Sequence, residues 1–184
     1  FNSTRQYHLP EISVWTDELW EMRADGPDQR VLLTHTHPEL NAKATCVADK
    51  AWFPDGGSLL CKIQHPDHLL LRVYLNGNVD VLYKDQQLGP SSTPHLSPDG
   101  RWVAFDTYQD TIGGRLWLLD VQTKTCRVLK TGQIIKGLTW LPDSRHLLYA
   151  RREKPGTNAD LWKLAIDGGE PVRVSDTPEL DEND

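Results

Sequence analysis

One short pattern recurs three times along the chain at a constant spacing. In each copy a Pro-Asp pair follows an apolar or small residue, and the pairs begin at positions 54, 98 and 142, which are 44 residues apart both times. A short apolar run follows each pair, at residues 58–63, 102–105 and 146–150. A period of about 20 to 50 residues is typical of chains built from one repeated supersecondary unit. We therefore expect an array of similar units.

A second pattern keeps nearly the same period. Trp117 lies 19 residues after Pro98, and Trp162 lies 20 residues after Pro142, each with a leucine before it. The matching pairs are Leu19-Trp20, Val73-Tyr74, Leu116-Trp117 and Leu161-Trp162. A Pro-Asp pair matching the first of them would fall at about position 1 if the period holds. We therefore expect the first copy to lack its first strand.

Each unit contains four short runs with β-strand character, separated by turn residues. In the third copy these runs are residues 93–97, 101–107, 115–120 and 126–130. No stretch of useful length has the period of an amphipathic helix. The pattern predicts an all-β chain, a β-propeller of about 3.75 four-stranded blades, because four strands in each repeat of about 40 to 50 residues are typical of a propeller blade.

The predicted blades cover residues 1–36, 43–84, 93–130 and 136–175, within a single propeller segment over 1–177. The first blade has three strands, at 6–14, 19–23 and 30–34, and an acidic tail occupies 178–184. An open array of blades leaves strand edges and apolar faces uncovered. This number of blades is not expected to close alone. We expect the ring to be completed by self-assembly or by the remainder of a longer chain.

The Pro-Asp turns have a local physical cause. Proline presets a φ near −65°, the aspartate side chain accepts a bond from a nearby backbone N–H, and glycine takes the positive φ that reverses the chain. We therefore interpret these aspartates as structural rather than catalytic. In the last copy Ser144 replaces the glycine, which predicts a slightly strained turn or a turn of another type.

The cysteines and tryptophans are interpreted as packing residues. Cys46, Cys61 and Cys126 are an odd number, and a hairpin turn at 54–57 places position 61 opposite about position 50 rather than 46. At about 3.4 Å per residue this offset separates Cys46 and Cys61 too far for a disulfide. We expect three buried thiols. The tryptophans expected to pack between blades are those at positions 20, 52, 117, 140 and 162, and the alternative is that they form a stacking platform for sugar.

Composition and missing motifs exclude several function classes. The net charge is −6 and no basic stripe is present, which argues against binding to nucleic acid or to an anionic membrane. No apolar run approaches the length needed for membrane insertion. The sequence also lacks a Gly-x-Ser-x-Gly elbow, a His-Glu-x-x-His motif and a phosphate-binding loop.

The repeat motifs resemble the TolB-type, WD-like β-propeller repeat of bacteria. One hairpin reads LSPDGRWVAF over residues 96–105, another reads DLWKLAIDGGE over 160–170, and the resemblance covers residues 15–177. It implies a fold but no single function. Similar propellers are protein-binding modules, gating domains of prolyl-oligopeptidase-like enzymes, or the body of oligogalacturonate lyases. The resemblance also implies a location in the bacterial periplasm or outside the cell, with the cytoplasm as the alternative.

Propeller topology sorts the connections of each blade onto two faces. The Pro-Asp turns share one face, whereas the connections between the second and third strands, and between successive blades, share the other. Five of the seven histidines are predicted on this second face: His35, His37, His65, His68 and His95. The basic residues Arg151 and Arg152 are predicted on the same face.

These residues allow two functional interpretations. His35 and His37 alternate with Thr36, so in an extended chain their side chains point the same way, and with His95 they form a candidate set for a divalent metal. Arg151 and Arg152 instead suit a carboxylate, because guanidinium groups bind carboxylates in bidentate fashion. A third interpretation is that all of these are solvated loop residues.

The function expected from the sequence is a binding or scaffold module that recognises a protein or a carbohydrate, without catalysis by this chain alone and without a cofactor. One alternative, implied by the resemblance, is part of a propeller enzyme acting on acidic oligosaccharides, with a divalent metal held mainly by histidines and with basic residues binding the sugar. No catalytic role is transferred to individual residues, because the ligand pattern of the lyases is not matched. The other alternative is the gating propeller of a prolyl-oligopeptidase-like peptidase.

Overall fold

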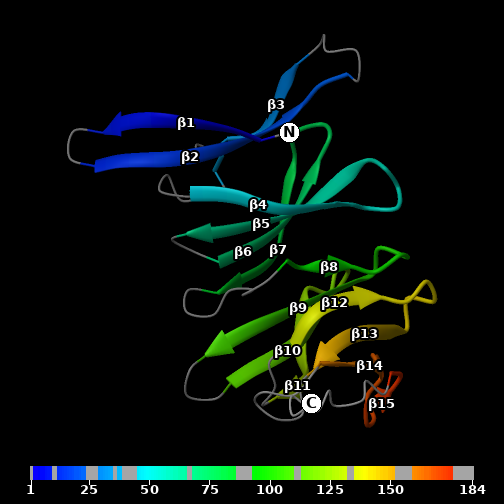
Figure 1. The fold of residues 1–184 in the computed structure, drawn as a ribbon. Helices are drawn as coiled ribbons and strands as arrows, with labels where there is room; N and C mark the ends of the chain where they lie inside the picture. Colours follow the sequence, from blue (N-terminus) through cyan, green and yellow to red (C-terminus); the bar gives the residue numbers. More distant parts are fainter. Residues whose placement is uncertain are drawn as a thin grey trace, which may run out of the picture. The chain divides into compact units, whose positions relative to one another are not determined.

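All regular structure in the described part of the chain is β-strand. The structure is a computed structural model, and it describes residues 2–9, 12–23, 29–34, 37–38, 45–65, 68–85, 93–109, 113–131, 135–151 and 159–175. Its strands form four antiparallel sheets (Figure 1), each made of strands that are consecutive in the sequence. No helix in these ranges is long and apolar enough to cross a membrane.

The four sheets, named A to D here, correspond to four successive blades. Sheet A contains β1 (Asn2–Leu9), β2 (Ile12–Glu21) and β3 (Arg30–Leu33). Sheet B contains β4 (Thr45–Trp52), β5 (Ser58–His65), β6 (His68–Tyr74) and β7 (Val79–Asp85). Sheet C contains β8 (His95–Leu96), β9 (Trp102–Gln109), β10 (Gly113–Asp120) and β11 (Thr125–Thr131). Sheet D contains β12 (Ile135–Trp140), β13 (His146–Arg151), β14 (Asp160–Ala165) and β15 (Val172–Arg173).

These sheets confirm the predicted all-β class and the four-stranded blade, with a first sheet of three strands. The chain divides into two compact units, Phe1–Gly89 with sheets A and B, and Pro90–Asp184 with sheets C and D. The single segment over 1–177 and the outer limits of the blades stay predictions. The acidic tail at 178–184 lies outside the described residues.

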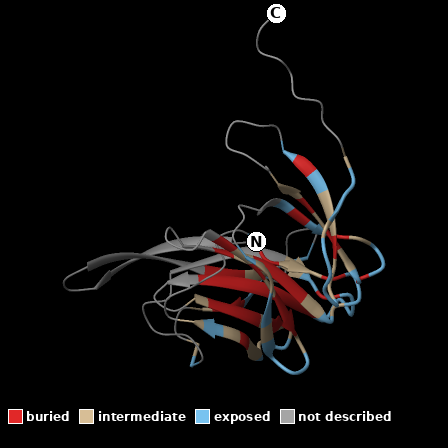
Figure 2. Cartoon of the chain, turned by 90° about the horizontal axis from the view of Figure 1, so that it is seen from below, coloured by how far each residue is buried: buried red, intermediate tan, exposed pale blue. Residues whose placement is uncertain are grey.

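Each unit has an apolar core between its two sheets, and Figure 2 shows which parts of the strands are buried. In the first unit Leu19 and Leu33 of sheet A pack against the face of sheet B that carries Cys61 and Leu71. In the second unit Ala104, Leu116 and Leu118 of sheet C pack against Leu147, Tyr149 and Leu164 of sheet D. Burial of apolar side chains on facing sheets is what holds neighbouring blades together.

The Pro-Asp turns have the same geometry in sheets B, C and D. In sheet C the N–H of Gly100 donates to the carbonyl of Ser97 at 2.8 Å, and Oδ1 of Asp99 accepts from the N–H of Arg101 at 3.0 Å. The same two bonds recur 44 residues before and 44 residues after, around Asp55 and Asp143. The structural interpretation of the three aspartates is therefore confirmed.

Ser144 adopts the conformation of the glycine that it replaces. Its φ is +55°, against +65° at Gly56 and +73° at Gly100. The last turn is therefore of the same type as the others, and a residue with a side chain is held in the left-handed region. Of the two predicted possibilities, the strained turn is the one observed. A left-handed φ costs a non-glycine residue about 1 to 2 kcal/mol.

In sheets B, C and D the Pro-Asp turn and the turn between the third and fourth strands lie at the same end of the sheet. The N–H of Leu75, in the turn between the third and fourth strands of sheet B, donates to the carbonyl of Gly57 in the Pro-Asp turn at 3.0 Å. Equivalent bonds join Val121 to Arg101 in sheet C and Ile166 to Arg145 in sheet D, both at 2.9 Å. The connection between the second and third strands consequently lies at the opposite end, which we call the loop end of a sheet.

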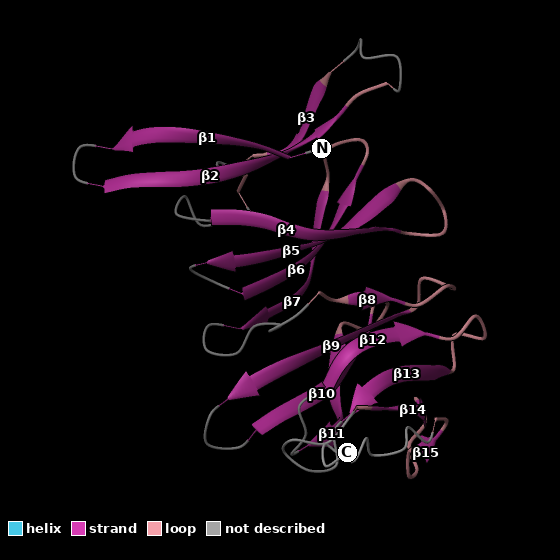
Figure 3. Cartoon of the chain, viewed as in Figure 1, coloured by secondary structure: helices cyan, strands magenta, loops and turns pink. Residues whose placement is uncertain are grey.

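The first hairpin differs from the prediction. A single strand was expected over 6–14, but this region contains the end of one strand and the start of the next, which form a hairpin (Figure 3). β1 ends at Leu9, β2 begins at Ile12, and Tyr7 pairs with Val14. Pro10 lies between them in the sequence and has no N–H to donate to a sheet, which favours a break there. β2 then runs on to Glu21, so the predicted strand at 19–23 is largely its second half.

The position of Val73-Tyr74 within its blade was also predicted wrongly. Trp20 in β2 and Trp117 in β10 both lie directly after a register shift, and in sheet B the residue at that place is Leu71 in β6. Tyr74 pairs with Ser58 near the turn end instead. Only 66–67 separate β5 from β6, whereas 110–112 separate β9 from β10, so counting residues from Pro54 overshoots the equivalent position.

The packing predictions are confirmed in part. Cys61 pairs with Lys50, as predicted, and its thiol is buried in the core. Cys126 is only partly buried, and the side chain of Cys46 lies outside the described residues. Trp140 packs between sheets C and D and its indole N–H donates to the carbonyl of His95 at 2.8 Å. Trp52 is 57% exposed, so its predicted packing between blades was wrong.

Candidate functional site

A group of polar side chains occupies one face of sheet D at its loop end. Tyr149 and Arg151 are two residues apart on β13, so their side chains lie on the same face of the sheet. Trp162 is directly opposite Tyr149 on β14, and Asp160 is opposite Arg151. These four residues therefore share the face that packs toward sheet C. We call them, with Arg173, the loop-end cluster.

Three polar atoms of the loop-end cluster are buried without a hydrogen-bond partner. They are the Tyr149 hydroxyl, Nε of Arg151 and Nε1 of Trp162. Among the described residues, no other buried side-chain nitrogen or oxygen lacks a hydrogen-bond partner. All three can donate a hydrogen bond. Leaving a buried polar group unsatisfied costs about 1 to 3 kcal/mol, so three such groups side by side require an explanation.

Arg151 and Trp162 form a stacked pair. The guanidinium carbon of Arg151 lies 4.7 Å from the centroid of the Trp162 ring, which is a cation–π distance. Both residues are partly exposed, whereas Tyr149 beside them is fully buried. The stacked pair thus lies between the buried hydroxyl and the surface of the second unit.

The carboxylate in the cluster is already engaged. Asp160 is 5% exposed, and its Oδ2 accepts from Nη2 of Arg173 at 2.6 Å. Arg173 is opposite Trp162 on β15, so this ion pair lies at the same end of the sheet. Asp160 pairs with Arg173, and no hydrogen bond joins it to Nε of Arg151.

The electrostatics of the cluster act on Tyr149. Burial raises the pKa of its hydroxyl above the ordinary value, Arg151 opposes this rise, and Glu170 adds to it. The hydroxyl is therefore protonated at neutral pH and serves as a donor.

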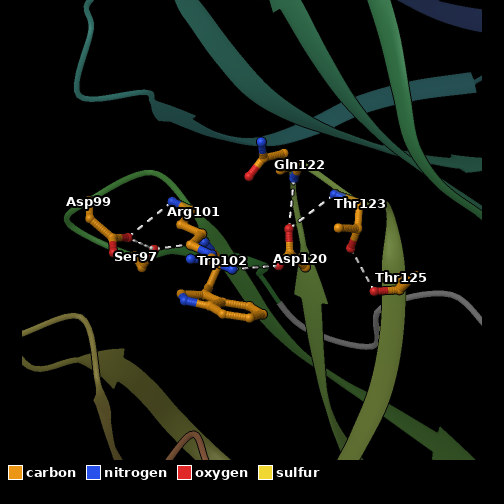
Figure 4. A network of polar contacts seen from close by, with 8 residues as sticks. All are labelled: Ser97, Asp99, Arg101, Trp102, Asp120, Gln122, Thr123 and Thr125. Atoms are coloured by element: carbon orange, nitrogen blue, oxygen red, sulfur yellow. Dashed lines mark hydrogen bonds and ion pairs between the residues drawn. The ribbon is translucent and has the colours of Figure 1, made fainter.

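A second polar network lies at the opposite end of the second unit, among the turns (Figure 4). Asp120 accepts from the N–H groups of Gln122 at 2.9 Å and Thr123 at 3.1 Å, and from Nη2 of Arg101 at 3.3 Å. In sheet D the ring of His146 contacts Asp143 at 2.6 Å beside a shallow depression of about 380 Å³. The polar atoms of these contacts bind one another, which fits a structural role.

The predicted site residues are distributed over both units. His68 begins β6 and is partly buried, His65 ends β5 with its side chain outside the described residues, and both lie at the loop end of sheet B. The N–H of His37 donates to the carbonyl of Thr34 at 3.1 Å, in the first unit. His95 pairs with Ala104 in the second unit, near the Pro-Asp turn. His35 and Arg152 lie outside the described residues.

The metal interpretation stays a prediction. Among the side chains that the structure describes, no three His, Cys, Asp or Glu residues come close enough together to hold a metal ion. Of the proposed ligands, His37 and His95 belong to different units and His35 is not described.

Of the predicted residues, Arg151 is the one that the structure places in a cluster of buried polar groups. Sequence reasoning missed Tyr149 and Asp160, and it interpreted Trp162 mainly as packing, with a stacking platform for sugar as the alternative. A signal for the cluster was present in the repeat, because Tyr149 and Arg151 stand 44 residues after Phe105 and Thr107. Phenylalanine to tyrosine adds a hydroxyl donor, and threonine to arginine replaces an acceptor by donors, on the same side of the strand.

Comparison with known structures supports the fold. No family model matches the chain. TolB from Acinetobacter baumannii is similar with a TM-score of 0.62 and 15% identity, over 90% of this chain and 39% of TolB. An oligogalacturonate lyase in complex with manganese has a TM-score of 0.68 and 16% identity, over 88% of this chain and 46% of the lyase. The β-propeller domain of the Trilobed protease from Pyrococcus furiosus has a TM-score of 0.56 and 18% identity, over 72% of this chain and 44% of that one.

These similarities confirm the predicted resemblance to TolB-type propellers at the level of the fold. The chain spans less than half the length of each of the three proteins. At such low identity the likeness shows the β-propeller fold alone, and function has to be argued from the site.

Proposed function

We propose that the protein is a β-propeller binding module whose ligand contacts the loop end of its blades. The observation that carries this proposal is the stacked pair of Arg151 and Trp162, with two donor atoms that no described residue satisfies. Arginine and tryptophan are the residue types most enriched among those that dominate binding energy at interfaces. Carbohydrate and protein ligands both present acceptor groups that suit such a pair.

An enzyme acting on acidic oligosaccharides is the second candidate. Its support is the fold similarity to the oligogalacturonate lyase with manganese, together with the unpaired donors at Arg151 and Trp162. In this proposal His35, His37 and His95 hold a divalent metal, and Arg151 and Arg152 bind the acidic sugar. The gating propeller of a peptidase is a third candidate, supported by the fold similarity to the protease propeller.

The location proposed for the module is the bacterial periplasm or the outside of the cell, with the cytoplasm as the alternative. This proposal is supported by the fold similarity to TolB. We propose further that other blades of the same repeat complete the ring.

The binding proposal is tested with a defined panel of probes. Trigalacturonate, cellotriose and a poly-glutamate peptide are titrated by calorimetry into the parent chain and into Arg151→Ala and Arg145→Ala. Arg145 is exposed in the turn of the same sheet, which makes it a matched control at the opposite end. We expect the parent to bind at least one probe, Arg151→Ala to lose affinity by tenfold or more, and Arg145→Ala to bind like the parent.

Two outcomes would change this conclusion. If no probe binds at millimolar concentration, or if both variants bind as the parent does, the loop end of sheet D is not the binding site. If trigalacturonate is instead converted to an unsaturated product in the presence of manganese, and the conversion is lost in His37→Ala, the second candidate replaces the first.

A further inference from the structure

The three unsatisfied donors of sheet D mark a departure from the repeat itself. In sheet C the residues at the equivalent positions are Phe105, Thr107 and Trp117, and Phe105 is opposite Trp117 as Tyr149 is opposite Trp162. There the indole N–H of Trp117 donates to Oγ1 of Thr107 at 2.9 Å. In sheet C the buried indole N–H is therefore satisfied by an acceptor within the same sheet.

Sheet D has no such acceptor at the equivalent position, and its substituted residues add further hydrogen-bond donors. Arg151 stands where Thr107 stands in sheet C, and a guanidinium has no acceptor to offer, so the indole N–H of Trp162 is left without a partner. Tyr149 stands where Phe105 stands and adds a hydroxyl that is likewise unsatisfied. Two changes on one strand therefore convert a self-sufficient packing arrangement into three donors that require an external acceptor.

The charge at this place selects the kind of acceptor. Arg151 is cationic, and the carboxylate opposite it, Asp160, is bound by Arg173. A neutral acceptor such as water satisfies a donor but leaves the guanidinium charge uncompensated in a partly buried place. An anion with several lone pairs satisfies both requirements, and hydrogen bonds between charged groups are about twice as strong as neutral ones.

We propose that the loop-end cluster binds a carboxylate, which accepts from Nε of Arg151, the indole N–H of Trp162 and the hydroxyl of Tyr149. This inference rests on the proposed binding function and names the chemistry of its ligand. The carboxylate belongs to an acidic sugar or to an acidic peptide side chain. Arg151 and Trp162 are each partly exposed, but the three donor atoms are buried, so the carboxylate reaches them when the stacked pair moves apart.

The test follows the indole N–H of Trp162 directly. The full chain is labelled with ¹⁵N-tryptophan, and the indole peaks of Trp162 and Trp140 are assigned by their absence in Trp162→Phe and Trp140→Phe. Trp140 is the internal control, because its N–H lies in the same unit and already has an acceptor at 2.8 Å. Acetate, glucuronate and glucose are then titrated at constant ionic strength, with chloride as the balancing anion.

We expect a saturable shift of the Trp162 peak with acetate and glucuronate, none with glucose, and none of the Trp140 peak. The shift should be lost in Arg151→Lys, which keeps the charge but removes Nε, and weakened at least tenfold in Tyr149→Phe. Thermal unfolding gives a second measurement. Tyr149→Phe should melt at or above the parent temperature without acetate, because it removes an unsatisfied hydroxyl, and acetate should raise the melting temperature of the parent only.

The outcomes separate this inference from the proposed function. If neither acetate nor glucuronate moves the Trp162 peak, and Tyr149→Phe melts below the parent, the donors have internal partners and the carboxylate site is refuted. If glucose moves the peak while the acids do not, the binding module stands and the ligand is a neutral acceptor. If no probe moves the peak and Arg151→Ala changes no binding in the panel, both proposals fall together.

Discussion

The backbone N–H of Asp99 donates a hydrogen bond to Oγ of Ser144 at 3.0 Å, across 45 positions of the sequence. The two residues lie in the Pro-Asp turns of sheets C and D. Ser144 is 7% exposed and has a φ of +55°. The serine that replaces the turn glycine therefore joins two neighbouring blades, and a glycine at that position could not make this bond.

This relationship predicts an unusual order of stability among substitutions at Ser144. Ser144→Ala loses the hydrogen bond and keeps the left-handed φ, so it should lower the free energy of unfolding by about 1 kcal/mol. Ser144→Gly loses the same bond but relieves a conformational cost of about 1 kcal/mol, so it should be close to neutral. Urea denaturation of the three proteins measures the order. An alanine variant as stable as the glycine variant would show that the strain is absent.

Asp120 predicts a dependence of stability on pH. Burial raises the pKa of its carboxyl, but the backbone N–H groups of Thr123 and Gln122 together with Arg101 outweigh burial, and the pKa lies below the ordinary value of 3.8. A carboxyl whose pKa is lower in the folded state stabilises the protein above the unfolded pKa and loses that contribution as pH falls through the folded pKa. Asp120→Ala should cost about 1 to 3 kcal/mol at neutral pH.

The matched variant is Asp120→Asn, which keeps an acceptor for the two N–H groups but does not titrate. Its stability deficit relative to the parent should be present at pH 6 and shrink as the pH falls below about 4. Denaturation in urea at a series of pH values measures both deficits. A deficit that stays constant down to the acid transition would contradict the lowered pKa of Asp120.

Sequence reasoning succeeded where the determinants are local. The Pro-Asp turns depend on a few neighbouring residues, so their position and the bonds of their aspartates followed from the pattern. At Ser144 the pattern left two possibilities open, and the strained turn is the one observed. It failed where strands have to be paired. Because the connection between β5 and β6 is shorter, the residue of sheet B equivalent to Trp117 is Leu71 and not Tyr74. Counting residues from the Pro-Asp pair does not reveal this difference.

The loop-end cluster illustrates the same limit. Arg151 was predicted as a basic loop residue, but its significance comes from Trp162 and Tyr149, which meet it only through the register of β13 and β14. The replacement of Phe105 and Thr107 by Tyr149 and Arg151 is visible in the sequence once the repeat is aligned. That the added donors are buried and unsatisfied follows only from the packing of sheet D on sheet C.

Arg72 predicts that arginine and lysine are not interchangeable in sheet B. Its guanidinium lies 4.0 Å from the centroid of Phe53 and 4.9 Å from that of Tyr74, and its Nε donates to Oγ of Ser58 at 2.8 Å. Arg72→Lys keeps the charge but loses the planar stacking and the Nε donor, and should cost about 1 to 2 kcal/mol. Arg145→Lys at an exposed turn is the control and should change stability by less than about 0.5 kcal/mol. Equal effects in thermal denaturation would contradict the stacking.

The outer face of sheet D predicts an association between copies of the chain. Leu161 occupies the position of Leu116, which is fully buried between sheets C and D, yet Leu161 is 40% exposed. Val172 at 60% and Val174 at 56% extend this apolar strip. The strip is thus equivalent to a face that covers the next blade elsewhere in the chain. The occupant we propose is sheet A of a second copy, where Val31 of β3 and Met22, directly after β2, are exposed.

Leu161→Glu places a charge in this strip and should abolish association without unfolding the chain, because the residue contributes little to the core of its own unit. Sedimentation velocity should show the parent associating as its concentration rises and the variant remaining slow at every concentration. Gln122→Glu adds the same charge at an exposed turn and should associate like the parent. A parent chain that stays monomeric at high concentration, or a Leu161→Glu variant that still associates, would remove sheet D as the docking face, since burial of such a strip is what drives blades together.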